Sequence, residues 1–197
     1  KGADIVHIHA IGPSLLTPFA RLLGLKVVIT HHGHDYHRDK WGALAKAVLR
    51  AGEKMGCRYA HEVISISKGI RNFVQERFHR PASLIYNGVN VPRRNGETDT
   101  LDTLSLQPGK YVLAVARLVP EKGLHDLIAA YSGIQTDWNL VIVGDADHQT
   151  EYSKQLKAQA AANRKIILAG TLYGDALAQV YSNAGLFVLP SYHEGLP

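Results

Sequence analysis

Short apolar runs alternate with amphipathic segments along most of this chain. The apolar runs have the length of strands and lie at residues 4–9, 26–30, 62–67, 82–86, 111–116, 139–143, 165–169 and 186–189. Between them, apolar positions with helical spacing occupy residues 13–23, 41–59, 68–78, 124–132, 151–162 and 175–182. Because strands that alternate with helices are typical of βαβ units, we expect an α/β fold built on parallel sheets.

The alternation lapses between residues 87 and 110. This stretch reads NGVNVPRRNGETDTLDTLSLQPGK and is rich in charges and turn-forming residues. We interpret it as the connection between two Rossmann-like domains, with the first at residues 1–89, a linker at 90–110 and the second at 111–197. Each block has fewer strands than such a domain usually needs. Both domains are therefore expected to be incomplete, the first at its beginning and the second at its end.

Composition indicates a globular protein, since hydrophobic residues make up 46% of the chain. The formal net charge of +5 suits anionic ligands such as nucleotide diphosphates or lipid phosphates and does not demand nucleic acid. The single cysteine, Cys57, fits a reducing compartment. No apolar run has the length of a membrane span, and nothing resembles a signal peptide. We expect a cytoplasmic protein whose chain begins within a longer one.

Two cations follow the most apolar run of the chain. Arg117 comes directly after residues 111–116, and Lys122 lies in the turn that Pro120 and Gly123 punctuate. Ligands of parallel sheets bind at the carboxyl ends of strands, where the next helix directs free N–H groups toward them. A guanidinium and an ammonium suit a diphosphate at this place. The plain alternative is a pair of solvated surface charges.

The segment ARLVPEKG, together with the terminal EGLP, resembles the donor half of retaining glycosyltransferases of family 4. HG at residues 32–33 and NGV at 87–89 extend the resemblance over nearly the whole chain. These group 1 enzymes belong to the GT-B superfamily with glycogen phosphorylase, and their two Rossmann-like domains face a cleft. The chain departs from the family in having Ala116 where Gly is common. The second Glu of the family's paired motif would fall beyond Pro197.

The resemblance implies the roles of individual residues. The catalytic set is His32, Arg117, Lys122 and Glu194. The two cations would hold the departing diphosphate, while His32 and Glu194 would orient sugar hydroxyls. The donor-binding set consists of Arg117, Lys122, Gly144, Glu194, Gly195 and Leu196. Asp35, Arg38 and Lys40 are expected on the acceptor side, although a polar loop that caps the next helix explains those three equally well.

The reaction that the resemblance implies moves a hexose from a nucleotide diphosphate-sugar to a hydroxyl group with retained configuration. The acceptor would be a saccharide or a lipid-linked molecule of polysaccharide or glycolipid biosynthesis. No cofactor and no metal are expected beside the donor substrate. We interpret Asp145 and Asp147 as turn formers and not as metal ligands.

The histidines support a rival interpretation. His7 and His9 at a strand end resemble the paired ligands of metal-dependent hydrolases, and His31, His34 and His37 offer further imidazoles for zinc or manganese. The plain alternative is a half-buried strand whose imidazoles bond to the backbone. We also keep open a sugar epimerase of the GT-B fold and a non-catalytic nucleotide-binding module.

A basic ridge marks the helical segment at residues 41–59. Lys46, Arg50, Lys54 and Arg58 recur at every fourth position and therefore share one side of the helix. A solvated face is the commoner explanation of such a ridge. We also consider an anionic membrane surface as a partner, with the protein peripheral at the cytoplasmic face.

Overall fold

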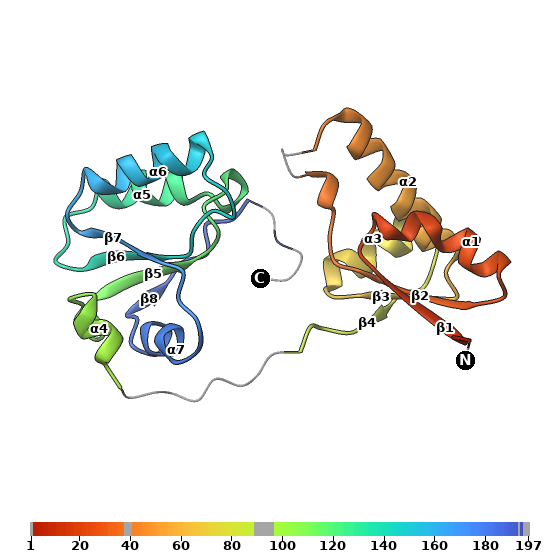
Figure 1. The fold of residues 1–197 in the computed structure, drawn as a ribbon, viewed down its shortest axis with the longest axis horizontal. Helices are drawn as coiled ribbons and strands as arrows, with labels where there is room; N and C mark the ends of the chain where they lie inside the picture. The colour runs from red at the N-terminus through yellow and green to blue at the C-terminus, as the bar shows by residue number, and fades with distance from the viewer. Residues whose placement is uncertain (1, 38–40, 89–96, 193, 195–197) are drawn as a thin grey trace. The chain divides into compact units, whose positions relative to one another are not determined.

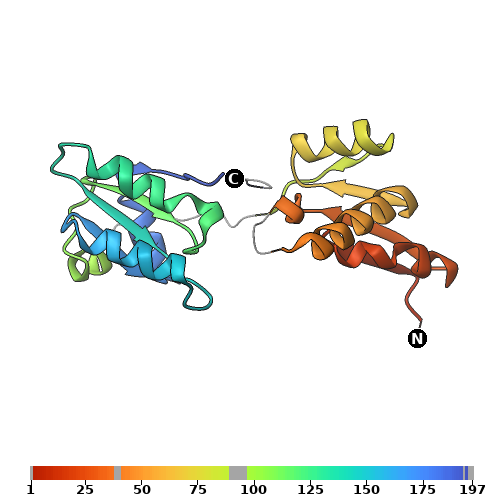
Figure 2. The same cartoon turned by 90° about the horizontal axis from the view of Figure 1, so that it is seen from above.

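The computed structural model of the chain describes residues 2–37, 41–88, 97–192 and 194. The chain forms two compact units: unit 1 spans Lys1–Val89 and Glu194–Pro197, and unit 2 spans Asn90–His193. Within the described residues, each unit is built on one parallel sheet of four strands (Figures 1 and 2). The expected pair of Rossmann-like α/β folds is confirmed.

Unit 1 alternates strand and helix. Its strands are β1 (Ile5–His9), β2 (Lys26–His31), β3 (Glu62–Ser65) and β4 (Ser83–Leu84). Its helices are α1 (Thr17–Leu22), α2 (Ala43–Tyr59) and α3 (Lys68–Phe78), with short 3₁₀ turns at η1 (Pro13–Leu16) and η2 (Asp35–His37). The strands lie side by side in the order β1-β2-β3-β4. All of them therefore end at the same edge of the sheet.

One face of the unit 1 sheet holds the apolar core. Val27 and Ile29 of β2 and Val63 of β3 are at most 2% exposed and pack with side chains of α2 and α3. Successive side chains of a strand point to opposite faces. Thr30 and its cross-strand partner His9 therefore lie on the other face of the sheet.

Unit 2 has the same alternation with a different strand order. Its strands are β5 (Tyr111–Val115), β6 (Asn139–Val143), β7 (Ile166–Gly170) and β8 (Leu186–Phe187). Its helices are α4 (Asp99–Thr103), α5 (Leu124–Ser132), α6 (Glu151–Ala161) and α7 (Gly174–Ser182), with a 3₁₀ turn at η3 (Pro120–Lys122). The order in space is β7-β6-β5-β8. The chain thus adds β6 and β7 on one side of β5 and then returns to add β8 on the other side of β5.

Helices cover both faces of the unit 2 sheet. Ile142 of β6 packs in a cluster with residues of α5 and α6, whereas its neighbour Val143 packs in a second cluster with residues of α4 and α7 (Figure 1). Leu113 and Ala114 of β5, which lies between β6 and β8, are 0% exposed. Burial on both faces explains why β5 is an unbroken apolar run and not an alternating one.

The structure differs from the sequence prediction in the second half of the expected linker. Residues 97–110 belong to unit 2 and contain α4. Leu101 and Leu106 are 0% and 5% exposed, and the N–H of Thr100 donates to Oε1 of Gln179 in α7 at 2.9 Å. The apolar positions that anchor this helix are surrounded by turn formers, which hid them in the sequence. Residues 89–96 lie outside the described part of the chain.

Candidate functional site

A pocket of about 490 Å³ opens at the carboxyl ends of β5, β6 and β7. Its walls are the loops that follow these strands, and they include Ala116, Arg117, Gly144, Asp147, Thr171 and Tyr173. Since β8 lies on the side of β5 away from β6, the strand order reverses at β5, whose carboxyl end forms one wall of this pocket. Open parallel sheets bind ligands at such reversals, and the volume suits a small molecule.

Gly144 lets the strand ends approach one another at this pocket. Its φ is 129°, and a Cβ on it would lie 2.1 Å from the carbonyl oxygen of Ala116. Its N–H donates to the carbonyl oxygen of Gly170 at 2.7 Å. Only glycine fits this backbone. The structure therefore gives Gly144 a turn role and brings it into the same pocket as Arg117.

Arg117 already has an ionic partner in the pocket wall. Its Nη1 lies 2.9 Å from Oδ2 of Asp147, and the two side chains are 45% and 67% exposed. Asp145 pairs with Lys157 of α6 at 2.9 Å, and the hydrogen bond from Lys157 lowers the pKa of Asp145. Exposed pairs of this kind contribute little to stability. A more highly charged anion can therefore displace Asp147 from Arg117 at small cost.

Lys122 ends the turn η3, which is held tightly against the segment after β8. Gly123 follows with a φ of 61°, and a Cβ on it would lie 2.3 Å from the carbonyl oxygen of Pro190. Lys122 is partly buried and is not among the described lining of the pocket that contains Arg117. Both cations thus lie on the loop between β5 and α5, but only Arg117 faces this pocket.

Tyr192 fastens the last segment of unit 2 to that loop. Its N–H donates to the carbonyl oxygen of Glu121 at 3.1 Å, and its hydroxyl contacts Asp126 and, at 3.1 Å, Nε2 of His125. The hydrogen bond to Asp126 raises the pKa of Tyr192. The segment that leads to EGLP therefore starts beside PEKG. Sequence reasoning did not identify Tyr192, whose only signal was its place before EGLP.

The remaining residues predicted for the donor site are described only in part. Glu194 is exposed. Gly195 and Leu196 lie outside the described residues. Their predicted roles stay predictions.

In unit 1, His32 follows β2 and joins the histidines of β1. Its Nε2 lies 3.0 Å from Nδ1 of His9, and Nε2 of His7 lies 2.8 Å from the hydroxyl of Thr30. Burial lowers the pKa of His32, as do the neighbouring His9 and His31, while Asp35 opposes them. A neutral imidazole at this place can donate or accept a hydrogen bond near neutral pH.

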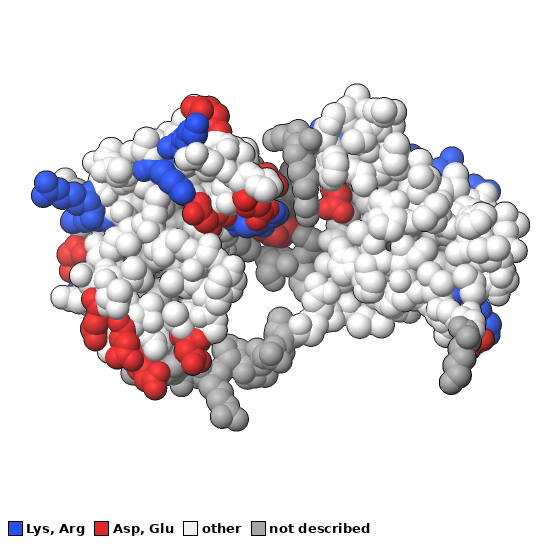
Figure 3. Space-filling view, viewed as in Figure 1, with Lys and Arg blue, Asp and Glu red and all other residues white. Residues whose placement is uncertain are grey.

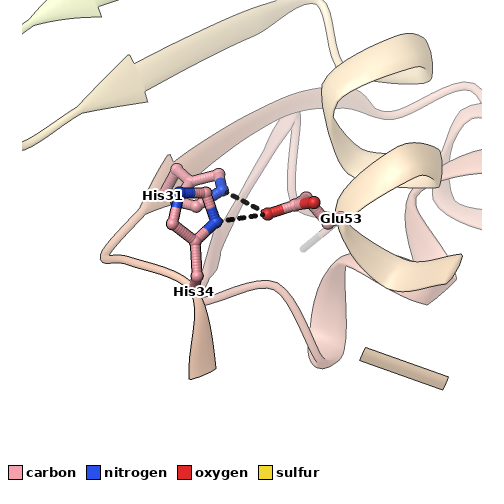
Figure 4. A group of neighbouring side chains, drawn as sticks. All are labelled: His31, His34 and Glu53. Atoms are coloured by element: carbon pink, nitrogen blue, oxygen red, sulfur yellow. Dashed lines mark hydrogen bonds and ion pairs between the residues drawn. The ribbon is translucent and has the colours of Figure 1, made fainter. Parts of the chain in front are cut away.

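His31 and His34 form a different group around a buried acid. Oε1 of Glu53, on α2, lies 2.9 Å from Nε2 of His31 and 3.1 Å from Nδ1 of His34 (Figure 4). The hydroxyl of Tyr36 donates to Oε2 of Glu53 at 3.2 Å. Burial raises the pKa of Glu53, but hydrogen bonds from His31 and His34 outweigh it and lower the pKa to about 2. The carboxylate is therefore ionised at neutral pH.

These three side chains have ligand atoms close enough to hold a metal ion, since the atoms lie within 4.8 Å of one another. The hydrogen bonds favour another arrangement. The N–H of Gly33 donates to Nδ1 of His31 at 3.2 Å, so the hydrogen of the neutral ring lies on Nε2, which faces Glu53. A metal ion would need that nitrogen unprotonated. The geometry therefore favours a hydrogen-bonded network.

The structure does not assemble the histidine set of the predicted hydrolase. His7 and His9 lie on one face of the sheet, and His31 turns to the other face, toward α2. The exposed His37 makes ring contacts with His34 and Tyr36. The alternation of side chains along β1 and β2 thus divides the histidines into two groups.

The predicted acceptor-side residues are placed only in part. Asp35 begins η2 and is partly buried. Arg38 and Lys40 lie outside the described residues.

Two family models match the chain. The model described as Glycosyltransferase Family 4 matches residues 1–93, and the model described as Glycosyl transferases group 1 matches residues 102–197. The chain belongs to the family 4, group 1 glycosyltransferases. The resemblance drawn from ARLVPEKG and EGLP is confirmed.

Curated relatives of this family are longer than the chain. An uncharacterized glycosyltransferase of Methanocaldococcus jannaschii is 28% identical over 158 residues, which cover 74% of this chain and 40% of the relative. The putative teichuronic acid biosynthesis glycosyltransferase TuaC of Bacillus subtilis is 24% identical over 201 residues, which cover 98% and 49%. The chain spans about half of the length of TuaC, or less for the archaeal protein.

Solved structures show the same fold. Sucrose-phosphate synthase of Thermosynechococcus elongatus matches 100% of this chain and 52% of its own with a TM-score of 0.81 at 23% identity. HepE of Anabaena, solved in complex with UDP, matches 96% of this chain and 54% of its own with a TM-score of 0.77 at 19% identity. The expected GT-B fold class is confirmed.

We predict that Gly144→Ala destabilises unit 2 by about 3 kcal/mol, because the new Cβ strains the backbone and meets the carbonyl of Ala116. Gly109→Ala is the matched control, since Gly109 has a φ of 73° but nothing within 4 Å of its Cβ position. It should cost about 1 kcal/mol. Urea unfolding followed by Trp138 fluorescence in a Trp41→Phe background measures both. Equal costs would contradict the close approach.

We also predict that unit 1 loses stability in acid through Glu53. Its folded-state pKa of about 2 lies below its ordinary value of 4.5. The ionised carboxylate therefore stabilises unit 1 above pH 4.5, and this stabilisation, about 3 kcal/mol in size, is lost as pH falls toward 2. Urea unfolding followed by Trp41 fluorescence in a Trp138→Phe background should show this loss. In Glu53→Gln the loss should be smaller by the same amount, and an unchanged loss would exclude Glu53 as its source.

Proposed function

We propose that the protein transfers a hexose from a nucleotide diphosphate-sugar to a hydroxyl of a saccharide or lipid-linked acceptor, with retained configuration. The observation that carries this proposal is Arg117 beside Gly144 in a pocket at the carboxyl ends of β5, β6 and β7 of unit 2. Family membership favours transfer over hydrolysis or epimerisation. The structures of HepE with UDP and with UDP-glucose support a nucleoside diphosphate donor, and the name of TuaC supports a role in polysaccharide biosynthesis.

In this proposal, the donor diphosphate replaces Asp147 as the partner of Arg117. The guanidinium offers two parallel N–H donors to phosphate oxygens, and Lys122 adds a second positive charge from the same loop. Negative charge grows on the diphosphate as the bond to the sugar breaks. Arg117 in the pocket, with Lys122 on the same loop, stabilises that charge where it develops, so the reaction needs no metal ion.

The sugar is oriented by groups at the ends of other strands. His32 hydrogen-bonds a sugar hydroxyl and is neutral near pH 7, while Glu194 accepts hydrogen bonds from further hydroxyls. Gly144, Gly195 and Leu196 complete the donor site, and Asp35, Arg38 and Lys40 contact the acceptor. Fixed orientation and charge stabilisation together lower the barrier without a covalent sugar–enzyme intermediate.

We predict that Arg117→Ala weakens binding of the matching nucleoside diphosphate about 10-fold, because a charge-assisted pair with phosphate is lost. A thermal-shift panel of UDP-, GDP- and ADP-sugars first selects the nucleotide, and calorimetric titration then measures the variant. Arg164→Ala, which removes an exposed cation of unit 2, is the matched control and should bind normally.

The same titration includes Asp147→Asn, which removes the competing carboxylate and should leave binding equal or tighter. Weaker binding by this variant, or normal binding by Arg117→Ala, would contradict the assignment of Arg117 to the diphosphate. Release of nucleoside diphosphate from the selected nucleotide-sugar, with an acceptor hydroxyl present, tests the transfer reaction itself.

We also propose an anionic membrane surface as a partner of unit 1. On the ridge of α2, Arg50, Lys54 and Arg58 are exposed. α1 packs beside α2, where Nη1 of Arg21 donates to the carbonyl oxygen of Tyr59 at 2.9 Å. α1 and the residues that flank it expose an apolar surface made of Leu16, Phe19, Leu22 and Leu23. Figure 3 shows Lys and Arg along the border of unit 1 where α2 lies, beside an uncharged face over α1.

This combination of exposed apolar side chains with neighbouring cations is typical of surfaces that lie on anionic lipid. Among the described residues, none of the helices is long and apolar enough to pass through a bilayer.

We predict that the double variant Lys54→Glu/Arg58→Glu binds vesicles containing phosphatidylglycerol at least about 10-fold more weakly, because each cation near an anionic surface contributes about 1 kcal/mol. Sedimentation of the intact protein with these vesicles and with neutral phosphatidylcholine vesicles measures the effect. Arg164→Glu/Lys165→Glu makes the same change of charge on unit 2 and should have no effect. Equal binding by the two double variants would exclude the ridge of α2.

A further inference from the structure

Glu53 is the only buried carboxylate among the described residues. It projects from the middle of α2 toward the loop that follows β2. Burial of an ionised carboxylate is costly unless donors surround it. The groups that contact the Glu53 carboxylate should therefore explain why an acid occupies this buried position.

All the described side-chain donors to Glu53 come from one short loop. They are Nε2 of His31, Nδ1 of His34 and the hydroxyl of Tyr36. His31 and His34 lie on either side of Gly33, whose φ is 129°. The carboxylate therefore fixes the loop on both sides of Gly33, the glycine with a positive φ.

Two aromatic contacts close the network from the other sides. Phe73 of α3 meets the ring of His34 edge to face at 4.3 Å between centroids. The guanidinium of Arg50 lies 5.1 Å from the centre of the Tyr36 ring. The loop is thus held by side chains from both α2 and α3, which are parts of the rigid core of unit 1.

His32 stands between the anchored residues but faces away from Glu53. Its ring lies on the other side of the sheet edge, with Nε2 3.0 Å from Nδ1 of His9. The N–H of Gly33, the next residue, donates to His31. The backbone on both sides of His32 is therefore fixed by a network that its own side chain does not join.

We propose that Glu53 is a positioning residue for His32, which it serves by holding His31, His34 and Tyr36 and thereby the loop that presents His32 to the sugar. The positional part of this proposal depends only on unit 1. The catalytic part rests on the proposed function.

The first test measures the position of the loop without any reaction. Glu53→Gln keeps the shape of the side chain but leaves at least one of the three donors without an acceptor. Amide hydrogen exchange followed by NMR should then show the Gly33 N–H exchanging about 10-fold faster by local opening, at a rate that low urea does not change, whereas the Val63 N–H of β3 follows the global stability of unit 1. Glu62→Gln makes the same charge change at an exposed position of unit 1 and should leave both rates unchanged.

The second test measures sugar transfer by the intact protein. Glu53→Gln should lower kcat by about 10-fold or more and change the KM for the nucleotide-sugar by less than about twofold, because the donor diphosphate binds to unit 2. Glu53→Asp retains an acceptor and should recover part of kcat. A merely stabilising role would leave kcat per folded molecule unchanged.

The outcomes separate the two proposals. An unchanged Gly33 exchange rate in Glu53→Gln overturns the positioning role whether or not the protein transfers sugar. Faster exchange with no transfer by the wild-type protein supports the positional part and contradicts the proposed function. If Glu53→Gln does not fold, Tyr36→Phe removes a single donor and should give a smaller change in the same direction; no change in exchange or in kcat for that variant overturns the proposal.

Discussion

Parallel strand pairing is the constraint on which both units depend. It requires every strand to end at the same edge of its sheet, and it sends the chain back through a helix before the next strand begins. Loops that are distant in sequence therefore meet at that edge. In unit 2 this brings Arg117, Gly144 and Thr171 into one pocket, and in unit 1 it sets His32 beside His9. The chemistry of the chain follows from this arrangement of strand ends.

The alternation of side chains along a strand gives the histidine-rich segment two separate parts. His31 turns into the core and donates to a buried carboxylate, while His32 turns to the opposite face and meets the imidazole of His9. These two adjacent residues therefore differ in role: His31 anchors the loop, and His32 is available to a ligand. The histidines that suggested a metal centre therefore serve two other purposes: some hold the loop by hydrogen bonds, and His32 is presented to a ligand. The Gly33 N–H donates to Nδ1 of His31, so that Nε2 of this ring carries the hydrogen and bonds to Glu53 instead of a metal ion.

In unit 2, the cation of the candidate site is held by an ion pair that takes little free energy to break. Arg117 is paired with an exposed Asp147, which can yield to an anion of higher charge. The backbone beneath it is less adjustable, because Gly144 and Gly123 each allow an approach that any side chain would prevent. Tyr192 then ties the segment after β8 to the loop that carries Lys122. Rigid backbone combined with exchangeable ion pairs suits a site that must bind and release a charged ligand.

Periodicity in the sequence was sufficient to predict the alternation of strands and helices and the α/β fold, and short motifs such as ARLVPEKG and EGLP indicated the family. The ranges of α3, α5 and β6 were predicted without error, because each has strong local spacing and a cap or turn at its ends. The sequence missed α4, whose apolar residues gain meaning only from the α7 surface that they contact. It also missed Glu53 and Tyr192, since a lone acid in a helix and a lone tyrosine in a loop have no local signature. Local pattern determines which element forms, whereas the partners of a side chain are decided only when distant strands and helices pack together.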